Sequence, residues 1–482
     1  MPRIPRSELT DYEWYHGDLS WQLRRHGQTR IYKFIHAWKY EGAEVKPIVV
    51  NAHRRLGKSY LNALMAIDAA KATPNYIVKL ICGEKEQVRD VYEPLIYQIL
   101  ETCPPDLYPK VRGTRLYFEN PAWPTKGRSL LQLCGANYKK GDMARGTACD
   151  RAFLDEVRDF KELEYFVTAV LSHQFQGRPD PCLVITSTPP WTMDHPFTRP
   201  ETGYIPRSMV DGRYICVPGS ENPDFTERDK RIVLGMIPGG EKDPAYQREV
   251  ECKLISDVGR LIIPEYQTAH EEVAVEEIVR PDFFLPYVVI DSGFDPDYTA
   301  IIFGYPDFLS QHLVVEAEVV EKRMATRRIA DATRAMMEKL EYDKQWYKPI
   351  LLADMDERGV TDLRREYKLS FLPVEKYDSK SGVATFRSRI GDRAFRLVKP
   401  GCPQLHYQLL HGIWDDAEKH KDFARSETLG HCDALKAAIY FNRMANFRFN
   451  PYPAGWRSGM LSSERKRLTG NSTSAILRAL GR

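Results

Sequence analysis

The sequence has no CxxC pair, no long apolar run and no large excess of charge of either sign. Its nine cysteines are scattered between Cys82 and Cys432, so neither a disulfide framework nor a zinc ribbon is expected, and a reducing cytosol suits the chain best. No stretch of about 18 apolar residues occurs, which excludes a membrane-spanning helix. The first residues, MPRIPRSELTDYEWY, lack the apolar core of a signal peptide.

What is present is typical of a soluble globular protein of several domains. The chain has 482 residues, of which 43% are hydrophobic and 28% charged. A chain of this length exceeds one hydrophobic core, and two to four domains are expected. The net charge of +3 neither requires nor excludes nucleic acid, because only the local distribution of charge decides that.

Apolar runs alternate with amphipathic stretches in the first half of the chain. The amphipathic stretches include 59–72 and 86–101, and this alternation predicts an α/β domain with a mostly parallel sheet covered by helices. The strand candidates are 47–50, 76–83, 129–135, 151–156 and 182–189.

A second α/β pattern begins after an acidic, proline-bounded segment at 241–286, which we interpret as a connection between domains. Residues 287–305 predict a strand, a tight turn and a second strand. The following elements are expected to be a strand at 312–321, a helix at 326–340, a strand at 349–359 and a helix at 431–444. We therefore predict four parts: 1–240, the connection 241–286, a second domain at 287–445 and a basic, flexible tail at 446–482.

The stretch IVVNAHRRLGKSYLNALMAID (48–68) is close to a phosphate-binding loop. It ends a strand-like run in Gly57, Lys58 and Ser59 and continues as an alanine- and leucine-rich helix. Such a loop surrounds an anion with backbone N–H groups and a helix N-terminus. The first glycine of the usual pattern is replaced by Ala52.

The residue types in this loop suit a nucleotide bound with Mg²⁺. Lys58 would reach the β- and γ-phosphates, and the Ser59 hydroxyl would hold the cation. Arg54 and Arg55 add positive charge near the γ-phosphate. The alternative is a basic turn between a strand and a helix that binds no ligand.

The end of the run RAFLDEV favours the nucleotide interpretation. An ATPase needs one acid for Mg²⁺ and a second to activate the attacking water, and Asp155 and Glu156 supply both at a strand end. The next apolar run ends in Ser187 and Thr188, which could sense hydrolysis and couple it to motion. Taken alone, the acids could be a solvated pair and the second run an ordinary strand followed by a turn.

Three acids in the second domain occupy positions suited to a two-metal nuclease. Asp291 and Asp354 each follow a buried run, and Asp433 begins a helix. Two divalent cations need several carboxylates that converge from different segments, and the order of elements predicts a ribonuclease-H-like domain. Each acid could equally be a turn or helix-cap residue. Four further acids are left open as supporting ligands: Asp297, Asp356, Glu316 and Glu318.

The order and spacing of these motifs resemble the large terminase subunit of tailed bacteriophages. In that family the variant loop RRLGKS, without the first glycine, is the usual form. The resemblance covers about residues 45–445 and includes the loop 52–59, DE at 155–156, TSTP at 186–189, ENP at 221–223, YQREVEC at 246–252, DSGFDPDYTA at 291–300, LADMDERG at 352–359 and HCDALKAAIY at 431–440.

The resemblance implies a role for each matching residue of the first domain. It implies a RecA-like P-loop ATPase in which Lys58, Ser59 and Arg54 bind phosphate or Mg²⁺, around Gly57. It makes Asp155 the Mg²⁺ acid and Glu156 the catalytic base, with Ser187 and Thr188 as the coupling motif. Arg145 resembles an arginine finger, acting in the same subunit or a neighbouring one, and Gln28 a residue that recognises adenine. Arg151 departs from the family by interrupting the apolar run before the acids.

For the second domain the resemblance implies a ribonuclease-H-like nuclease with Asp291, Asp354 and Asp433 as ligands of two Mg²⁺ or Mn²⁺ ions. It implies a motor that hydrolyses ATP to translocate double-stranded DNA into a procapsid and cuts concatemeric DNA. The expected partners are the portal protein, a small terminase subunit and further copies in a ring, a pentamer in the family, with no membrane. The expected location is the host cytoplasm and, transiently, the portal vertex.

Two other functions are compatible with the motifs. A helicase or repair translocase with a nuclease domain would carry a second nucleotide-binding pattern, whereas the region after 287 carries acids at strand ends. An ATP-switched assembly protein could have a second domain that does not cut. Substitution of Asp291 separates the last case from a nuclease.

Overall fold

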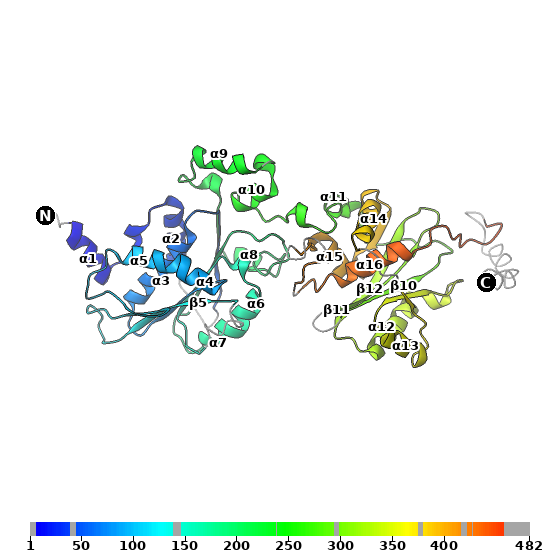
Figure 1. Ribbon diagram of the computed structural model, residues 1–482, viewed down its shortest axis with the longest axis horizontal. Coiled ribbons are helices and arrows are strands. Elements are labelled where there is room, and N and C mark those ends of the chain that lie inside the picture. The colour runs from blue at the N-terminus through cyan, green and yellow to red at the C-terminus, as the bar shows by residue number, and fades with distance from the viewer. Residues whose placement is uncertain are drawn as a thin grey trace. The chain divides into compact units, whose positions relative to one another are not determined.

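The computed structural model describes residues 6–38, 45–137, 146–237, 239–293, 298–374, 379–415, 422–426 and 428–456. The chain divides into two compact units, Met1–Asp257 (unit 1) and Val258–Arg482 (unit 2) (Figure 1). Arg145, predicted as a site residue, and Asp297, left open as a supporting ligand, lie outside the described residues, as does the tail beyond 456.

Unit 1 is built on an eight-stranded sheet in the order β3-β4-β5-β2-β6-β7-β1-β8. Its strands are β1 (Ile48–Ala52), β2 (Ile77–Cys82), β3 (Lys110–Arg112), β4 (Arg115–Phe118), β5 (Ser129–Gly135), β6 (Arg151–Asp155), β7 (Cys182–Ser187) and β8 (Tyr214–Val217). The run from β5 to β8 is parallel throughout, and β3 and β4 extend it as an antiparallel edge.

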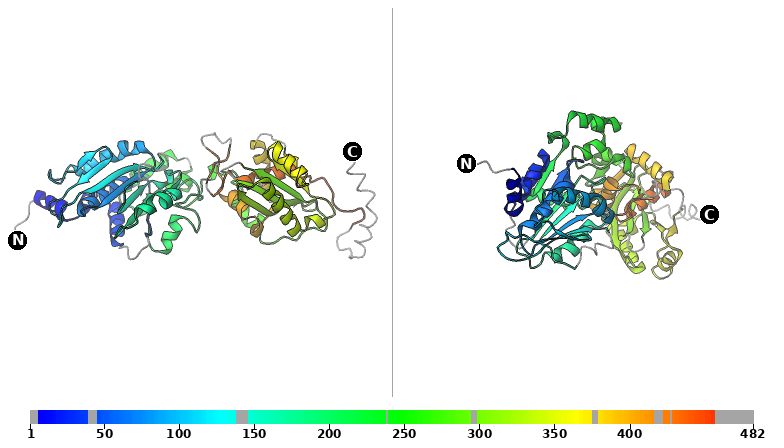
Figure 2. Two further views of the ribbon diagram at one scale, coloured as in Figure 1. Left: turned by 90° about the horizontal axis from the view of Figure 1, so that it is seen from below. Right: turned by 60° about the vertical axis from the view of Figure 1, so that its left-hand side comes forward.

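Helices and apolar cores lie on both faces of this sheet (Figure 2). Neighbouring side chains of one strand lie on opposite faces of the sheet, because side chains alternate along a strand. Val50 packs in one core and Val49 in the other. The α-helices are α1 (Arg6–His16), α2 (His26–Ala37), α3 (Lys58–Ala72), α4 (Lys85–Gln87), α5 (Glu93–Leu100), α6 (Leu163–Tyr165), α7 (Ser172–Gln174), α8 (Tyr204–Val210), α9 (Glu227–Met236) and α10 (Pro244–Glu249).

The parallel register brings the predicted loop and acids of unit 1 to one edge of the sheet. Asn51 pairs with Ser187, and Asp155 pairs with Thr186. Because parallel strands end at the same edge, the carboxyl ends of β1, β6 and β7 meet there. This is where open α/β sheets bind ligands.

Unit 2 contains a seven-stranded mixed sheet in the order β14-β13-β10-β11-β12-β15-β9. Its strands are β9 (Ala274–Val275), β10 (Tyr287–Ser292), β11 (Tyr298–Pro306), β12 (Leu313–Lys322), β13 (Ile350–Asp354), β14 (Leu372–Pro373) and β15 (Phe395–Val398). Strands β10, β11 and β12 form an antiparallel meander, and the outer pairings on both sides are parallel. The predicted α/β class therefore holds for both units.

The helices of unit 2 cover both faces of its sheet, with α14 and α16 on one face and α12 and α13 on the other (Figure 1). The expected connection 241–286 contributes α10 to unit 1 and α11 and β9 to unit 2. The α-helices are α11 (Tyr266–Val273), α12 (Thr326–Lys339), α13 (Glu357–Arg365), α14 (Ser379–Gly391), α15 (Pro403–His411) and α16 (Asp433–Met444).

All nine cysteines are free thiols, as expected from their scattered positions. Among the described residues, no helix combines the length and the apolarity needed to cross a bilayer.

Candidate nucleotide and metal sites

The predicted phosphate loop connects β1 to α3 through a turn that only glycine adopts easily. Gly57 has φ +91° and precedes the helix that begins at Lys58. A Cβ at this position would lie 2.5 Å from Nε2 of Gln28, so both backbone conformation and space favour glycine. Lys58 is almost buried, and its ammonium donates to the carbonyls of Ala52 (3.0 Å) and His53 (3.3 Å). The ammonium is thereby folded back over the loop.

Asp155, at the end of β6, is held by hydroxyl and amide groups from neighbouring elements. The Ser59 hydroxyl donates to Oδ2 (2.6 Å), and Asn62 (3.0 Å) and Thr186 (2.8 Å) donate to Oδ1. Tyr92 also donates to Oδ2. The structure thus brings Ser59 of the loop and Asp155, the two predicted Mg²⁺ ligands, into direct contact.

Glu156 lies next to the ammonium of Lys58 and has an unusual backbone conformation, with φ +50°. Its Oε2 is 3.7 Å from Nζ of Lys58, and its Oε1 accepts from Thr188 and lies 2.8 Å from Nε of Arg158. Burial opposes ionisation of Glu156, but the charges of Lys58 and Arg158 and the Thr188 hydrogen bond outweigh it, so its pKa is lowered. The carboxylate is therefore ionised at neutral pH.

Two residues predicted to bind the nucleotide, Arg54 of the loop and Gln28 of α2, have partners within unit 1. The backbone N–H of Arg54 donates to the carbonyl of Glu249 (2.9 Å), and the Arg54 guanidinium, largely exposed, lies 3.9 Å from the Glu249 carboxylate. Gln28 of α2 donates to the Gly57 carbonyl (3.0 Å) and accepts from the backbone N–H of Arg24 (3.3 Å). Gln28 thus contacts the phosphate loop itself.

Ser187 and Thr188, the predicted coupling residues, lie at the end of β7 and are buried. Ser187 accepts from the backbone N–H of Arg158 (3.2 Å), while Thr188 donates to Glu156. Both predicted residues thus contact the segment that carries the acids.

His53 connects the loop to the ENP segment at 221–223. Burial lowers its pKa to about 4, so the ring is neutral at pH 7. Nδ1 lies 2.8 Å from the carbonyl of Arg54, and Nε2 lies 2.9 Å from the amide nitrogen of Asn222. A neutral ring that donates at Nδ1 and accepts at Nε2 fits both contacts.

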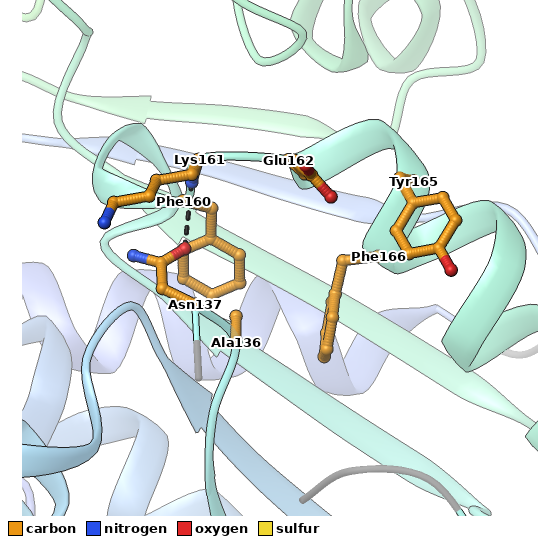
Figure 3. Close-up of a pocket in the computed structure, with 7 residues that line it drawn as sticks. All are labelled: Ala136, Asn137, Phe160, Lys161, Glu162, Tyr165 and Phe166. Carbon is orange, nitrogen blue, oxygen red and sulfur yellow. Dashed lines mark hydrogen bonds between the residues drawn. The ribbon is translucent and has the colours of Figure 1, made fainter. Parts of the chain in front are cut away.

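A small cavity of about 80 Å³ lies beside the ends of β5 and β6 but is separate from these contacts (Figure 3). The side-chain oxygen of Asn137 accepts from the backbone N–H of Lys161 (2.9 Å). The cavity contains none of the predicted nucleotide residues, so the candidate site is the open edge of the sheet. The cavity is lined by Ala136, Asn137, Phe160, Lys161, Glu162, Tyr165 and Phe166.

In unit 2, two of the three predicted metal ligands are neighbours. Asp291 of β10 and Asp354 of β13 are directly paired across parallel strands. Tyr440 of α16 donates to Oδ2 of Asp354 (2.8 Å). Burial, followed by the charges of Asp291 and Asp354, raises the pKa of Tyr440, so this hydroxyl remains a donor.

Asp433 is the first residue of α16, the helix that packs against β10 and β11. Its Oδ2 accepts from the backbone N–H groups of Tyr298 and His431, both at 3.3 Å. Tyr298 closes the hairpin that begins at Gly293. Asp433 therefore lies by the hairpin that follows Asp291.

Three of the four acids left open as ligands lie in the described residues, and each has a structural partner. Asp356 accepts from the backbone N–H of Gly359 (3.0 Å) and caps α13. Glu316 pairs with Arg280 (2.7 Å) and accepts from Tyr342 (2.6 Å). Glu318 accepts from the backbone N–H groups of Gln404 and Leu405 at the start of α15.

Within the described ranges, no three His, Cys, Asp or Glu side chains are grouped closely enough to hold a metal ion. Asp291 and Asp354 are neighbours across β10 and β13, and both carry carboxylate oxygens, the ligands that Mg²⁺ and Mn²⁺ prefer. These residues fit a divalent cation, and Asp433 would have to exchange backbone N–H groups for the cation to join them.

Four residues that complete these contacts were given no role from the sequence, although Glu249 and Tyr440 lie in the motifs YQREVEC and HCDALKAAIY. Arg158, Glu249 and Tyr92 surround the acids of unit 1, and Tyr440 holds Asp354. Arg158 follows Glu156 closely and Tyr440 lies on the helix of Asp433, so closeness along the chain was a usable signal for these two. Glu249 and Tyr92 lie far from the motifs they contact.

No protein-family model matches the chain, and no curated protein matches it. Solved structures are similar in fold. The large terminase of bacteriophage HK97 is 14% identical, with a TM-score of 0.49, over 92% of this chain and 100% of that one. The large terminase of a thermophilic bacteriophage, in complex with ADP, is 15% identical, with a TM-score of 0.38, over 87% of this chain and 99% of that one.

A further match covers a smaller part of the chain. The nuclease domain of the large terminase of bacteriophage SPP1, with bound Mn, is 18% identical, with a TM-score of 0.27, over 35% of this chain and 94% of that one. The chain is thus similar in structure, at low sequence identity, to large terminases of bacteriophages.

Proposed function

We propose that unit 1 hydrolyses ATP with Mg²⁺. The observation that carries this proposal is the contact of Ser59 with Asp155 at 2.6 Å, beside Lys58 and Glu156 at 3.7 Å. Four residue types required for ATP hydrolysis, from two motifs far apart in sequence, meet at one edge of a parallel sheet.

Each residue then has a role that its chemistry supports. Lys58 exchanges the carbonyls of Ala52 and His53 for phosphate oxygens. Ser59 and Asp155 would hold Mg²⁺, which would neutralise charge on the phosphates. Glu156, ionised and next to the phosphate loop, accepts a proton from the attacking water.

We propose that unit 2 is a metal-dependent endonuclease. Asp291 and Asp354 supply the adjacent carboxylates, and Asp433 approaches from α16. Divalent cations at these oxygens would activate water and stabilise the leaving 3′ oxygen of DNA.

The combined activity that we propose is packaging of viral DNA. It rests on the order of motifs, which resembles that of large terminase subunits along about residues 45–445. The chain would translocate double-stranded DNA into a procapsid as a ring on the portal protein, in the host cytoplasm, with a small terminase subunit as partner. Phosphate contacts from Lys and Arg grip DNA without reading its sequence, as a translocase needs.

Plasmid cleavage and ATP hydrolysis by three purified proteins test the proposal: wild type, Lys58→Ala and Asp291→Ala. With Mg²⁺ or Mn²⁺, we expect wild type and Lys58→Ala to cut and Asp291→Ala not to cut. We expect wild type and Asp291→Ala to hydrolyse ATP and Lys58→Ala to fall to background. Circular dichroism of each variant controls for folding.

The outcome separates this proposal from its alternatives. Absence of cutting by folded wild type in either metal, with ATP hydrolysis retained, favours an ATP-switched assembly protein. Strand separation of a DNA duplex by wild type would favour a helicase.

A further inference from the structure

Arg158 lies between two carboxylates beside the candidate nucleotide site. Its Nε is 2.8 Å from Oε1 of Glu156, and its Nη1 donates to Oε1 of Glu249 at 2.6 Å. The Arg158 side chain is only 10% exposed, so water screens these ion pairs little. A third carboxylate, that of Asp159, is farther from Nε, at 3.8 Å.

The position of Arg158 is fixed by three elements that meet at this edge. Arg158 belongs to a short 3₁₀ turn (Val157–Asp159) after β6, and its backbone N–H donates to the Ser187 hydroxyl at the end of β7. Glu249 comes from α10, and its carbonyl accepts from Arg54 of the phosphate loop. Arg158 therefore connects β6, β7 and α10, the link to β7 through its backbone N–H and the link to α10 through its guanidinium.

Glu156 needs such support because its backbone is unfavourable for an ordinary residue. Its φ of +50° is a conformation held only where the surroundings determine it. Two cations, Lys58 and Arg158, contact its carboxylate. When Lys58 turns to phosphate, Arg158 is the cation that remains in contact with Glu156.

We propose that Arg158 is a positioning residue for ATP hydrolysis. It holds the Glu156 carboxylate at the edge of the sheet while Lys58 binds phosphate, and Glu249 holds Arg158 in turn. This inference rests on the proposed ATPase activity of unit 1. Arg158 acts through Glu156, so its loss should slow the chemical step while ATP binding is kept.

Steady-state ATP hydrolysis by the full chain tests the proposal. For Arg158→Ala we expect kcat to fall roughly 10-fold to 100-fold, while KM for ATP stays within about threefold of wild type. Arg158→Lys keeps the charge and should recover part of kcat. Glu249→Gln should lower kcat less than Arg158→Ala does, and the double variant should be no slower than Arg158→Ala alone, because the two residues act in series.

Arg199→Ala is the matched control. Arg199 also joins two carboxylates in unit 1, those of Asp194 and Glu164, both at 3.3 Å, and its side chain is 15% exposed. We expect its kcat to stay near that of wild type. An equal loss in Arg199→Ala would show a general effect on folding and would overturn the inference.

The other possible results of these measurements also test the inference. An unchanged or increased kcat in Arg158→Ala, or a change confined to KM, overturns the positioning role. If Arg158→Ala does not fold, Glu249→Gln carries the test, and wild-type kcat in that variant overturns the inference. Wild type that binds but does not hydrolyse ATP overturns the proposed function, and the inference with it.

Discussion

Asp155 accepts hydrogen bonds from four side chains that belong to α3, to β7 and to the segment between α4 and α5. Donors from separate elements fix both carboxylate oxygens in place. Burial and the charge of Asp155 in turn raise the pKa of Tyr92, which keeps its hydroxyl a donor. The carboxylate orientation is therefore set by the fold before any cation binds, which lowers the cost of binding one.

In unit 2 the same reasoning applies to Tyr440, which donates to Asp354 at 2.8 Å. Tyr440→Phe removes this donor and leaves the ring in place. We expect the Mn²⁺ concentration for half-maximal plasmid cleavage to rise about tenfold or more, as for other partners of metal ligands. Tyr347→Phe is the control, because the Tyr347 hydroxyl donates to the Pro451 carbonyl. This variant should leave that concentration unchanged. An equal rise in both variants would contradict the role of Tyr440.

The raised pKa of Glu318 predicts that the stability of the fold depends on pH. Burial, the largest effect, raises its pKa from the ordinary 4.5 to about 7, against the backbone N–H groups that favour its ionised form. An acid with a raised pKa stabilises the fold at low pH, and this contribution is lost as pH rises from about 4.5 to about 7. We expect the Tm of wild type, relative to Glu318→Gln, to fall by about 2–4 °C between pH 5 and pH 8.

Thermal unfolding of both proteins at several pH values checks this expectation. Groups other than Glu318 titrate alike in the two proteins and cancel in the Tm difference. A difference that does not vary with pH, or that grows toward high pH, would refute it.

The motif residues could be predicted from sequence because their chemistry demands particular residue types at short spacing, as in Gly57, Lys58 and Ser59. Contacts such as that of Arg158 with Glu249 could not, because they depend on how α10 packs beside β6. The same limit applies to Glu318. It accepts hydrogen bonds from the start of α15, which lies far along the chain.

At the scale of elements, the strands of unit 1 that the sequence predicted are those buried on both faces, which appear as continuous apolar runs. β1, β2, β5, β6 and β7 all lie within or close to the expected ranges. The edge strands were not predicted, because β3 is fully exposed and β8 alternates between buried and partly buried residues over a short length. Short edge strands such as β9 and β14 carry too few residues to form a pattern.

The contact between α2 and the phosphate loop makes a prediction about Gln28. Its side-chain nitrogen donates to Gly57 and its side-chain oxygen accepts from Arg24. Gln28→Ala should therefore remove one hydrogen bond that holds α2 against the loop and one that joins α2 to the segment before it. We expect unit 1 to lose about 1–3 kcal/mol of stability, with a lower Tm. We expect the ratio of ATP to GTP hydrolysis to stay within about threefold of wild type.

Urea or thermal unfolding, together with hydrolysis of both nucleotides, checks this prediction. A large change in the preference for ATP over GTP at unchanged stability would instead show that Gln28 recognises adenine, as the resemblance to large terminases implies.

At the scale of the whole molecule, each unit contains its own sheet, its own cores and one candidate site. The sequence predicted this division into two α/β parts, because a second set of strand patterns begins after the phosphate-loop half. It did not predict that residues 241–286 would form α10, α11 and β9, since their contacts come from elements far along the chain. We therefore expect that a substitution can remove the activity proposed for one unit and leave that proposed for the other intact.

Assembly makes a further prediction about ATP hydrolysis. If Arg145 acts on a neighbouring copy, as an arginine finger does, it contributes roughly a thousandfold or more to the rate. We then expect specific ATPase activity to rise steeply with protein concentration, and Arg145→Ala to abolish the rise. Turnover measured over a wide range of protein concentrations checks this. Constant specific activity in wild type would exclude action between copies.

The reactivity of the native cysteines determines where a fluorescent dye would attach to this chain. Seven of the nine are buried, and Cys103 and Cys216 are half-buried. Burial raises the pKa of Cys103 to about 12, whereas a hydrogen bond with Cys252 lowers that of Cys216. Because thiolates are the species that react, Cys216 is the native thiol to replace first. A cysteine then introduced on the exposed face of α9 would report selectively on that helix during turnover.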